Sequence, residues 1–197
     1  PNPASDAKVE YIYQNGKIPA VYSANEKYSA RISNTGNTTL TNIPVTLNIT
    51  GANSFSPAAV VIPSLAPCAS TVVDFATFTS TSVGANSVSV SIPADDDLTN
   101  NTKTVTQTVT ANLFDSRTAG QTNSGGVGFT GATGAFIGKF TAAVPALINE
   151  VQVDFTSSGN AYRLGIYAAD GPSGTPGTLI YTDATDRLTA VGTAFAA

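Results

Sequence analysis

The amino-acid sequence predicts an all-β protein made of two successive β-sandwich regions, of which the second is incomplete. Three observations lead to this prediction. Apolar and polar residues alternate in short runs, turn-forming residues separate these runs, and the periodicity of amphipathic helices is nearly absent. A two-residue period places alternate side chains on opposite faces of a strand, as in antiparallel sheets that bury one face and expose the other.

The alternation is clearest in three runs, where every second residue is apolar and those between are mostly polar. The apolar positions are Tyr28, Ala30 and Ile32; Ile43, Val45, Leu47 and Ile49; and Val88, Val90 and Ile92. We expect a single hydrophobic core to include Ile32, Val45, Leu47, Val73, Phe75, Val88, Val90 and Ile92.

Turn signals such as Asn15-Gly16 and Asn34-Thr35-Gly36 separate the predicted strands. Strands are expected near residues 7–13, 18–22, 27–34, 42–50, 58–62, 70–78, 86–93 and 102–110, the first two being either separate or one strand broken at Pro19. About seven strands in about 110 residues are typical of an immunoglobulin-like antiparallel β-sandwich. With one Cys and no Trp, the apolar faces alone must hold its sheets together.

Residues 1–110 are therefore expected to form the immunoglobulin-like domain. Residues 111–126 lack apolar periodicity and are rich in turn formers, which predicts a linker. Alternation returns in residues 127–197, the predicted second β-domain. We expect this domain to be completed by further residues of the protein or by a neighbouring subunit, since unpaired strand edges recruit other strands.

Residues 21–109 resemble bacterial cell-adhesion-related modules known as CARDB domains. The resemblance lies in Tyr28-Ser-Ala-Arg-Ile-Ser-Asn-Thr-Gly36, Ile43-Pro-Val-Thr-Leu47, Ile62-Pro-Ser-Leu65, Ser70-Thr-Val-Val-Asp-Phe75 and Asp95-Asp-Asp-Leu-Thr-Asn-Asn101. In such modules a strand ending in Asn-x-Gly precedes a Leu-x-x-Gly turn, and here Cys68 stands where that Gly is expected. The resemblance implies a spacer or an adhesive unit.

The second region resembles jelly-roll modules appended to secreted proteins of Bacteroidetes-type bacteria. The matching features are the Leu164-x-Ile166-Tyr167 strand, the loop with Asp170-Gly171 and Gly174-Thr-Pro-Gly177, and the Leu179-Ile-Tyr181 strand. About 70 residues match, and they correspond to the first half of such a domain.

The composition excludes several classes of function. The chain has no His, so Ser-His-Asp and Cys-His catalysis cannot be assembled within it, and we expect no enzyme. The net charge is −4 and the nine Lys and Arg residues are scattered, which argues against nucleic acid as a partner. No apolar run reaches the roughly 18 residues of a membrane-spanning helix.

Three features have both a functional and an ordinary interpretation. Asp95, Asp96 and Asp97, with Asn100 and Asn101, form either a Ca²⁺ site, the only cofactor expected, or a solvated hairpin. The loop carboxylate of Asp170, with Tyr162, Tyr167 and Tyr181, either binds sugar or belongs to an ordinary loop and core. Cys68 is either a small turn residue or a reactive or intermolecular thiol.

Charged residues make up only 11% of the chain, against roughly 25% in ordinary soluble domains, and Thr, Ser and Asn supply polarity instead. This composition is typical of extracellular β-proteins. The sequence therefore predicts a non-catalytic structural or adhesive segment of a bacterial surface or secreted multi-domain protein or filament. Its expected partners are neighbouring domains or subunits, and glycans remain open. The alternative is an accessory carbohydrate-binding region of a secreted hydrolase.

Overall fold

The computed structural model describes residues 3–22, 24–118, 125–126, 128–129, 131–192 and 194–196. In this part of the chain all regular structure is β, apart from one 3-10 turn at Pro172–Gly174, so the predicted fold class is confirmed. The chain divides into two compact units, Pro1–Gln121 with Phe140–Pro145, and Thr122–Lys139 with Ala146–Ala197. Among the described residues, no helix is long and apolar enough to cross a membrane.

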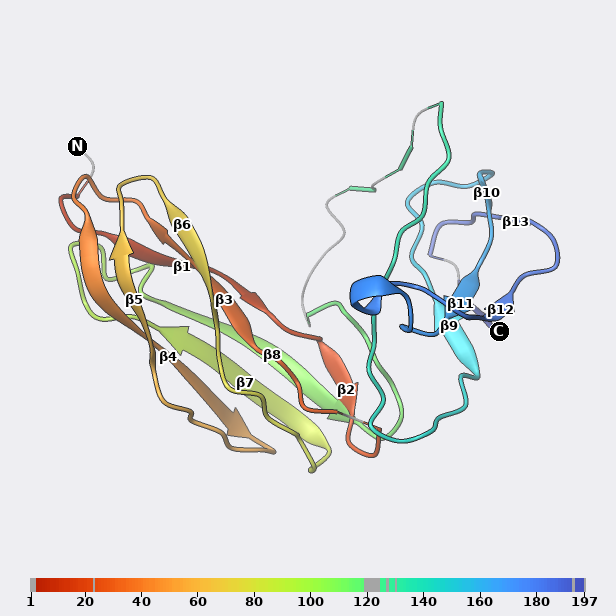
Figure 1. The fold of residues 1–197 in the computed structure, drawn as a ribbon, viewed down its shortest axis with the longest axis horizontal. Helices are drawn as coiled ribbons and strands as arrows, with labels where there is room; N and C mark the ends of the chain where they lie inside the picture. The colour runs from red at the N-terminus through yellow and green to blue at the C-terminus, as the bar shows by residue number, and fades with distance from the viewer. Residues whose placement is uncertain are drawn as a thin grey trace. The chain divides into compact units, whose positions relative to one another are not determined.

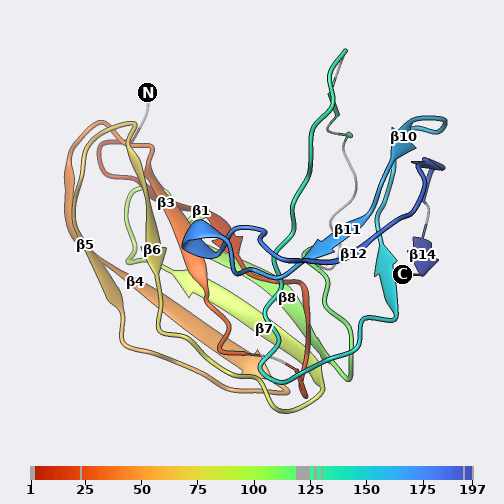
Figure 2. The same cartoon turned by 45° about the vertical axis from the view of Figure 1, so that its right-hand side comes forward.

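The first unit is an immunoglobulin-like β-sandwich of two sheets, which Figures 1 and 2 show as two layers. The three-stranded sheet has the order β1-β3-β6, with β1 (Ala7–Tyr13), β3 (Ser29–Asn34) and β6 (Ser70–Asp74). The five-stranded sheet has the order β2-β8-β7-β4-β5, with β2 (Lys17–Pro19), β8 (Thr102–Thr110), β7 (Gly84–Ser91), β4 (Leu40–Gly51) and β5 (Val60–Leu65).

The core between the sheets contains the alternating apolar residues. All eight predicted core residues belong to one buried cluster, so this prediction is confirmed. Tyr28, Ala30 and Ile32 are each fully buried, as are Val45 and Leu47. The two-residue period explains this result, because every second side chain of a strand points to the same face.

The strand after Asn15-Gly16 belongs to a different sheet from the strand before it. β1 pairs with β3, whereas β2 pairs with β8. The sequence left open whether these were one strand or two, and the structure shows two. β2 also runs parallel to β8, from Lys17 beside Thr108 to Pro19 beside Thr110, while the other strand pairs of the sandwich are antiparallel. Because the chain crosses here from one sheet to the other, β1 forms an edge of the three-stranded sheet and β2 forms an edge of the five-stranded sheet.

The two turns that resemble CARDB modules lie side by side. The side-chain amide of Asn34 donates to the carbonyl oxygens of Thr38 and Leu65 at 2.8 and 2.9 Å, and its oxygen accepts from Gly36 N at 3.0 Å. Cys68 N donates to Asn34 O at 3.0 Å. Cys68 has a φ of +60°, the left-handed region that favours glycine. Its conformation therefore matches the glycine expected at this position.

The second unit contains short strand pairs and few buried residues. The pairs are β9 (Glu150–Gln152) with β14 (Ala194–Ala196), β10 (Ala161–Tyr162) with β13 (Arg187–Leu188), and β11 (Gly165–Tyr167) with β12 (Leu179–Thr182). Among its described residues no hydrophobic side chain is buried, and its most enclosed apolar side chains are only half-buried: Val151, Phe155, Tyr162, Leu164, Ile166 and Tyr181.

A polar centre ties part of the second unit together. Asp183 is 4% exposed and accepts from Arg187 Nη2 and Nε at 2.6 and 2.8 Å, from Leu164 N at 2.9 Å and from Tyr181 Oη at 3.0 Å. The hydrogen bonds from Arg187 are the main reason that the pKa of Asp183 falls to about 2. The jelly-roll interpretation of this region stays a prediction.

The predicted domain boundaries also stay a prediction. Residues 119–124, 127 and 130 of the predicted linker and second domain lie outside the described residues. Before this gap the chain remains attached to the sandwich, since Lys17 and Asp115 exchange two backbone hydrogen bonds of 2.9 and 3.0 Å. Their side chains also form an ion pair with 3.3 Å between Nζ and Oδ2.

Candidate functional site

A β-bulge in β1 exposes two tyrosines. The register between β1 and β3 shifts between Val9 and Tyr11, so one extra residue stands in β1. Val9 before the bulge and Ile12 after it are both buried, although they are three positions apart. Tyr11 and Tyr13 consequently face outward, with exposed fractions of 54% and 45%.

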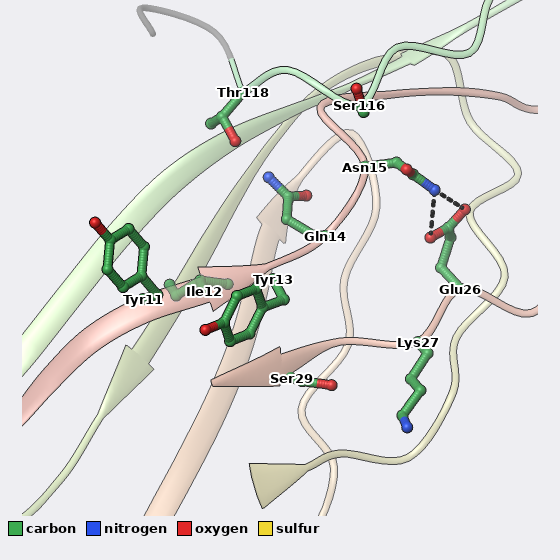
Figure 3. Close-up of a pocket in the computed structure, with 10 residues that line it drawn as sticks. All are labelled: Tyr11, Ile12, Tyr13, Gln14, Asn15, Glu26, Lys27, Ser29, Ser116 and Thr118. Carbon is green, nitrogen blue, oxygen red and sulfur yellow. Dashed lines mark hydrogen bonds between the residues drawn. The ribbon is translucent and has the colours of Figure 1, made fainter. Parts of the chain in front are cut away.

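These tyrosines border a groove where the chain crosses from the three-stranded to the five-stranded sheet (Figure 3). The groove has a volume of about 510 Å³. The residues that line it include Tyr11, Tyr13, Gln14, Asn15, Glu26 and Lys27. Ser116 and Thr118, which follow β8, also line the groove (Figure 3). Side chains from three segments that are far apart in the sequence therefore meet at one place.

The tyrosine rings form a small aromatic surface. Their centroids are 6.3 Å apart and their planes differ by 23°. The ammonium group of Lys103 lies 5.4 Å from the centroid of the Tyr11 ring, a distance at which cation–π attraction holds the ring in place. Such a surface offers apolar ring faces with hydroxyl groups at their edges.

Polar groups stand beside this aromatic surface. Asn15 Nδ2 lies 3.3 Å from both carboxylate oxygens of Glu26 (Figure 3). Burial raises the pKa of the Glu26 carboxyl, and the hydrogen bond from Asn15 opposes this shift. The side-chain nitrogen and oxygen of Gln14 are shielded from solvent and have no hydrogen-bond partner in the described part of the chain. Gln14 extends toward the segment that carries Ser116 and Thr118 (Figure 3).

A buried polar network holds the groove from behind. Gln107 Nε2 donates to Asn15 O at 3.1 Å, and Gln107 Oε1 accepts from Tyr28 Oη at 2.8 Å. Both Gln107 and Tyr28 are fully buried. On the other side, Glu26 and Phe78 exchange backbone hydrogen bonds of 2.8 and 3.0 Å. Asn15 and Glu26 are therefore held in position before any ligand binds.

The stability of the sandwich is expected to fall as the pH rises from about 10 to about 12. Burial raises the pKa of Tyr28 from 10.0 to about 12, which the hydrogen bond to Gln107 partly opposes. The folded state therefore favours the protonated phenol, and this contribution is present below pH 10 and lost as the pH passes about 12. Its size is about 2–3 kcal/mol, from 1.4 kcal/mol per pKa unit.

Urea unfolding of the wild type and Tyr28→Phe across this pH range measures the effect. Tyr28→Phe should lack this part of the decline, whereas Tyr13→Phe, which alters an exposed tyrosine, should retain it. Parallel curves for the wild type and Tyr28→Phe would contradict the prediction.

Asp95 and Asp96 hold the N-terminal segment of the sandwich, whereas Asp97 accepts hydrogen bonds from Thr99 and Asn100 in its own turn. Asp95 accepts from Ala7 N at 2.7 Å and Asp96 from Ser5 N at 2.8 Å. Hydrogen bonds from Thr99 lower the pKa of Asp97. In the described part of the chain, no group of three or more Asp, Glu or Cys side chains is arranged to hold a metal ion. The three carboxylates thus have separate structural partners, and their binding of Ca²⁺ stays a prediction.

The structure does not gather Asp170 and the three tyrosines of the second unit into one shared cluster. Asp170 accepts from the backbone N and the hydroxyl of Thr178, both at 2.7 Å, and so closes its own loop. The centroids of the Tyr162 and Phe155 rings are 4.7 Å apart, and the Tyr181 hydroxyl donates a hydrogen bond to Asp183. Tyr167 is 49% exposed. Sugar binding at this loop stays a prediction.

Sequence reasoning missed the groove. Strict alternation through residues 7–13 places Tyr11 and Tyr13 on the same face as Ala7 and Val9, in the core. The run Glu10-Tyr11-Ile12-Tyr13 fits burial of either the two tyrosines or Ile12, so the local sequence held no signal that decides between them. Glu26 and Gln14 carried no local signal, because only the fold brings them together.

Comparison with solved structures finds similar chains over about half of this chain. No protein-family model and no curated protein matches. A crystal structure of a Pyrococcus furiosus CARDB domain in complex with di-metal ions is 20% identical, with a TM-score of 0.46, and covers 54% of this chain and 89% of that domain. A domain from Methanosarcina acetivorans, provisionally named a cell surface protein, is 20% identical, with a TM-score of 0.44. The match covers 54% of this chain and 92% of that domain.

Proposed function

We propose that this chain is a non-catalytic structural or adhesive segment of a bacterial surface or secreted multi-domain protein or filament. The observation that carries the proposal is the contrast between its units. The first has a closed hydrophobic core, whereas no described hydrophobic side chain of the second is buried. A closed module joined to an open one is the arrangement of a segment that works together with neighbouring domains or subunits.

Burial of apolar surface is what offsets the conformational entropy lost on folding. In the second unit Leu147, Ile180 and Leu188 are 84%, 65% and 67% exposed. Exposed apolar surface on this scale marks an interaction site on a soluble protein. We therefore expect the second unit to be covered in the working protein, either by further domains of the same chain or by another subunit.

The 197-residue chain by itself should self-associate in a concentration-dependent way, as sedimentation velocity can measure. Replacing Leu147 and Leu188 together by Ser should weaken the association, because both side chains expose most of their surface. Val61→Ser is the matched control, since Val61 is 53% exposed on the first unit.

A monodisperse monomer with slow amide hydrogen exchange across residues 146–192 would contradict the proposal. Slow exchange requires a closed, cooperative unit. Such a result would show that the second unit is stable without a neighbour.

The proposal also predicts no turnover. The chain has no His, the commonest general base. Peptide, ester and glycoside substrates should remain intact with the purified chain, and hydrolysis that disappears on replacing a single carboxylate would contradict the non-catalytic role.

The second candidate is an accessory carbohydrate-binding region of a secreted hydrolase. The groove beside Tyr11 and Tyr13 favours it, because a rigid aromatic surface with adjacent hydrogen-bonding groups suits such a ligand. The full gene sequence separates the two candidates: neighbouring repeats indicate a surface protein, and a neighbouring glycosidase or protease domain indicates a hydrolase. Both candidates place the chain outside the cell.

A further inference from the structure

We propose that the groove beside Tyr11 and Tyr13 binds an uncharged carbohydrate. This inference rests on the adhesive role proposed above and names its ligand class. The groove combines the exposed tyrosine rings, the Glu26 carboxylate, and the Gln14 side-chain amide, which has no hydrogen-bond partner among the described residues. These three features select for the same ligand.

The aromatic surface is presented rigidly and without being covered. Ile12, between the two tyrosines in sequence, is buried in the core and anchors the strand. The rings of Tyr11 and Tyr13 are 54% and 45% exposed, with planes only 23° apart. A pyranose ring has one face rich in C–H groups, which packs against such aromatic faces and releases the water that covers them.

Glu26 supplies hydrogen-bond acceptors at the edge of this surface. An ionised carboxylate has about four acceptor positions and no donor. Asn15 Nδ2 is shared between the two oxygens at 3.3 Å each, so acceptor positions remain. Adjacent hydroxyl groups of a sugar can donate to both oxygens at once. Because burial has removed water from Glu26, a donor that replaces this water is bound more strongly than at an exposed carboxylate.

Gln14 supplies unfilled hydrogen-bonding capacity. Its side-chain nitrogen and oxygen are shielded and have no hydrogen-bond partner among the described residues, which is unfavourable for buried polar groups. A sugar hydroxyl is both donor and acceptor, so it matches either end of the amide.

The charges of the groove argue for an uncharged ligand. Lys27 is paired with Asp74 at 2.8 Å between Nζ and Oδ2, and Lys103 lies against Tyr11. A proline-rich peptide also packs on tyrosines, but its proline residues offer only carbonyl acceptors. Glu26 needs donors, which proline residues lack and which every hydroxyl group of a sugar provides.

Nuclear magnetic resonance titration of the full chain with neutral hexasaccharides of glucose, xylose, mannose and galactose tests this inference. At least one should shift the side-chain amide signals of Gln14 and Asn15. Tyr11→Ala and Tyr13→Ala should each weaken binding about tenfold or more, because stacking area is lost, and Glu26→Gln should weaken it through lost charge-assisted hydrogen bonds.

Two controls accompany these variants. Tyr167→Ala removes a tyrosine that is 49% exposed on the second unit and should leave the affinity unchanged. Tyr13→Phe keeps the ring and should retain most of the affinity. Tyr11 and Tyr13 are both exposed, so thermal unfolding should show that their alanine variants remain folded.

Three outcomes would overturn the inference. The wild type could bind no hexasaccharide more strongly than the Tyr11→Ala/Tyr13→Ala double variant does, or the affinity for sugar could stay the same when either tyrosine is replaced. The third is that only a proline-rich peptide, and no hexasaccharide, binds in a way that depends on the tyrosines. Loss of sugar binding would leave the non-catalytic role intact. Cleavage of a bound hexasaccharide would instead overturn the non-catalytic role while the binding site remained.

Discussion

Replacing Asn34 by alanine is expected to lower the free energy of unfolding by about 2–5 kcal/mol. Asn34 is 1% exposed, and its side chain makes three hydrogen bonds, to Thr38 O, Leu65 O and Gly36 N. Alanine removes all three hydrogen bonds, and each backbone group that is then buried without another partner costs about 1–3 kcal/mol. Gly36 N keeps its hydrogen bond to Asp6 O at 3.2 Å, so the cost falls on the carbonyl groups of Thr38 and Leu65. The turn after β3 would then separate from the end of β5.

Chemical denaturation measures this change, and Asn48→Ala is the matched control. Asn48 is exposed and accepts a hydrogen bond from the Ser56 hydroxyl at the surface, so its replacement should change the stability by about 0.5 kcal/mol or less. Asn34→Asp retains the acceptor for Gly36 N but places a negative charge beside two carbonyl oxygens, and it should also destabilise the fold. Equal stabilities of Asn34→Ala and Asn48→Ala would show that the two turns do not depend on Asn34.

Leu47→Ala is expected to lower the free energy of unfolding by about 2–5 kcal/mol, the range for removing a buried leucine side chain. Leu47 is fully buried in β4, opposite Val90 of β7 and within the cluster between the two sheets. The cost has two parts, the lost transfer of apolar surface from water and the cavity that rigid neighbouring strands leave unfilled.

Val72→Ala provides the comparison for Leu47→Ala in the same denaturation experiments. Val72 lies in β6 but is 53% exposed, so its truncation should cost about 0.5 kcal/mol or less. If both variants lost the same stability, the core would not lie between the sheets on the face that contains Leu47.

The candidate groove shows where prediction from sequence ends. Its residues belong to β1 and the turn that follows it, to the segment that leads into β3 and to the segment after β8, and no local pattern connects them. The bulge in β1 depends on pairing with β3, since only the partner strand reveals that one residue is extra. Asp183 was missed for the same reason, because its partners include Leu164, 19 positions away.

Alternation alone established the all-β class, the position of β1 from Ala7 to Tyr13 and of β8 from Thr102 to Thr110, and the eight core residues. These properties follow from side-chain direction, which is set within each strand. Tertiary structure decided that β2 joins β8 in the second sheet, that Tyr11 and Tyr13 face solvent, and that Asp95 and Asp96 hold the N-terminal segment. Each of these depends on hydrogen bonds or strand pairing between residues far apart in the chain, which local periodicity does not encode.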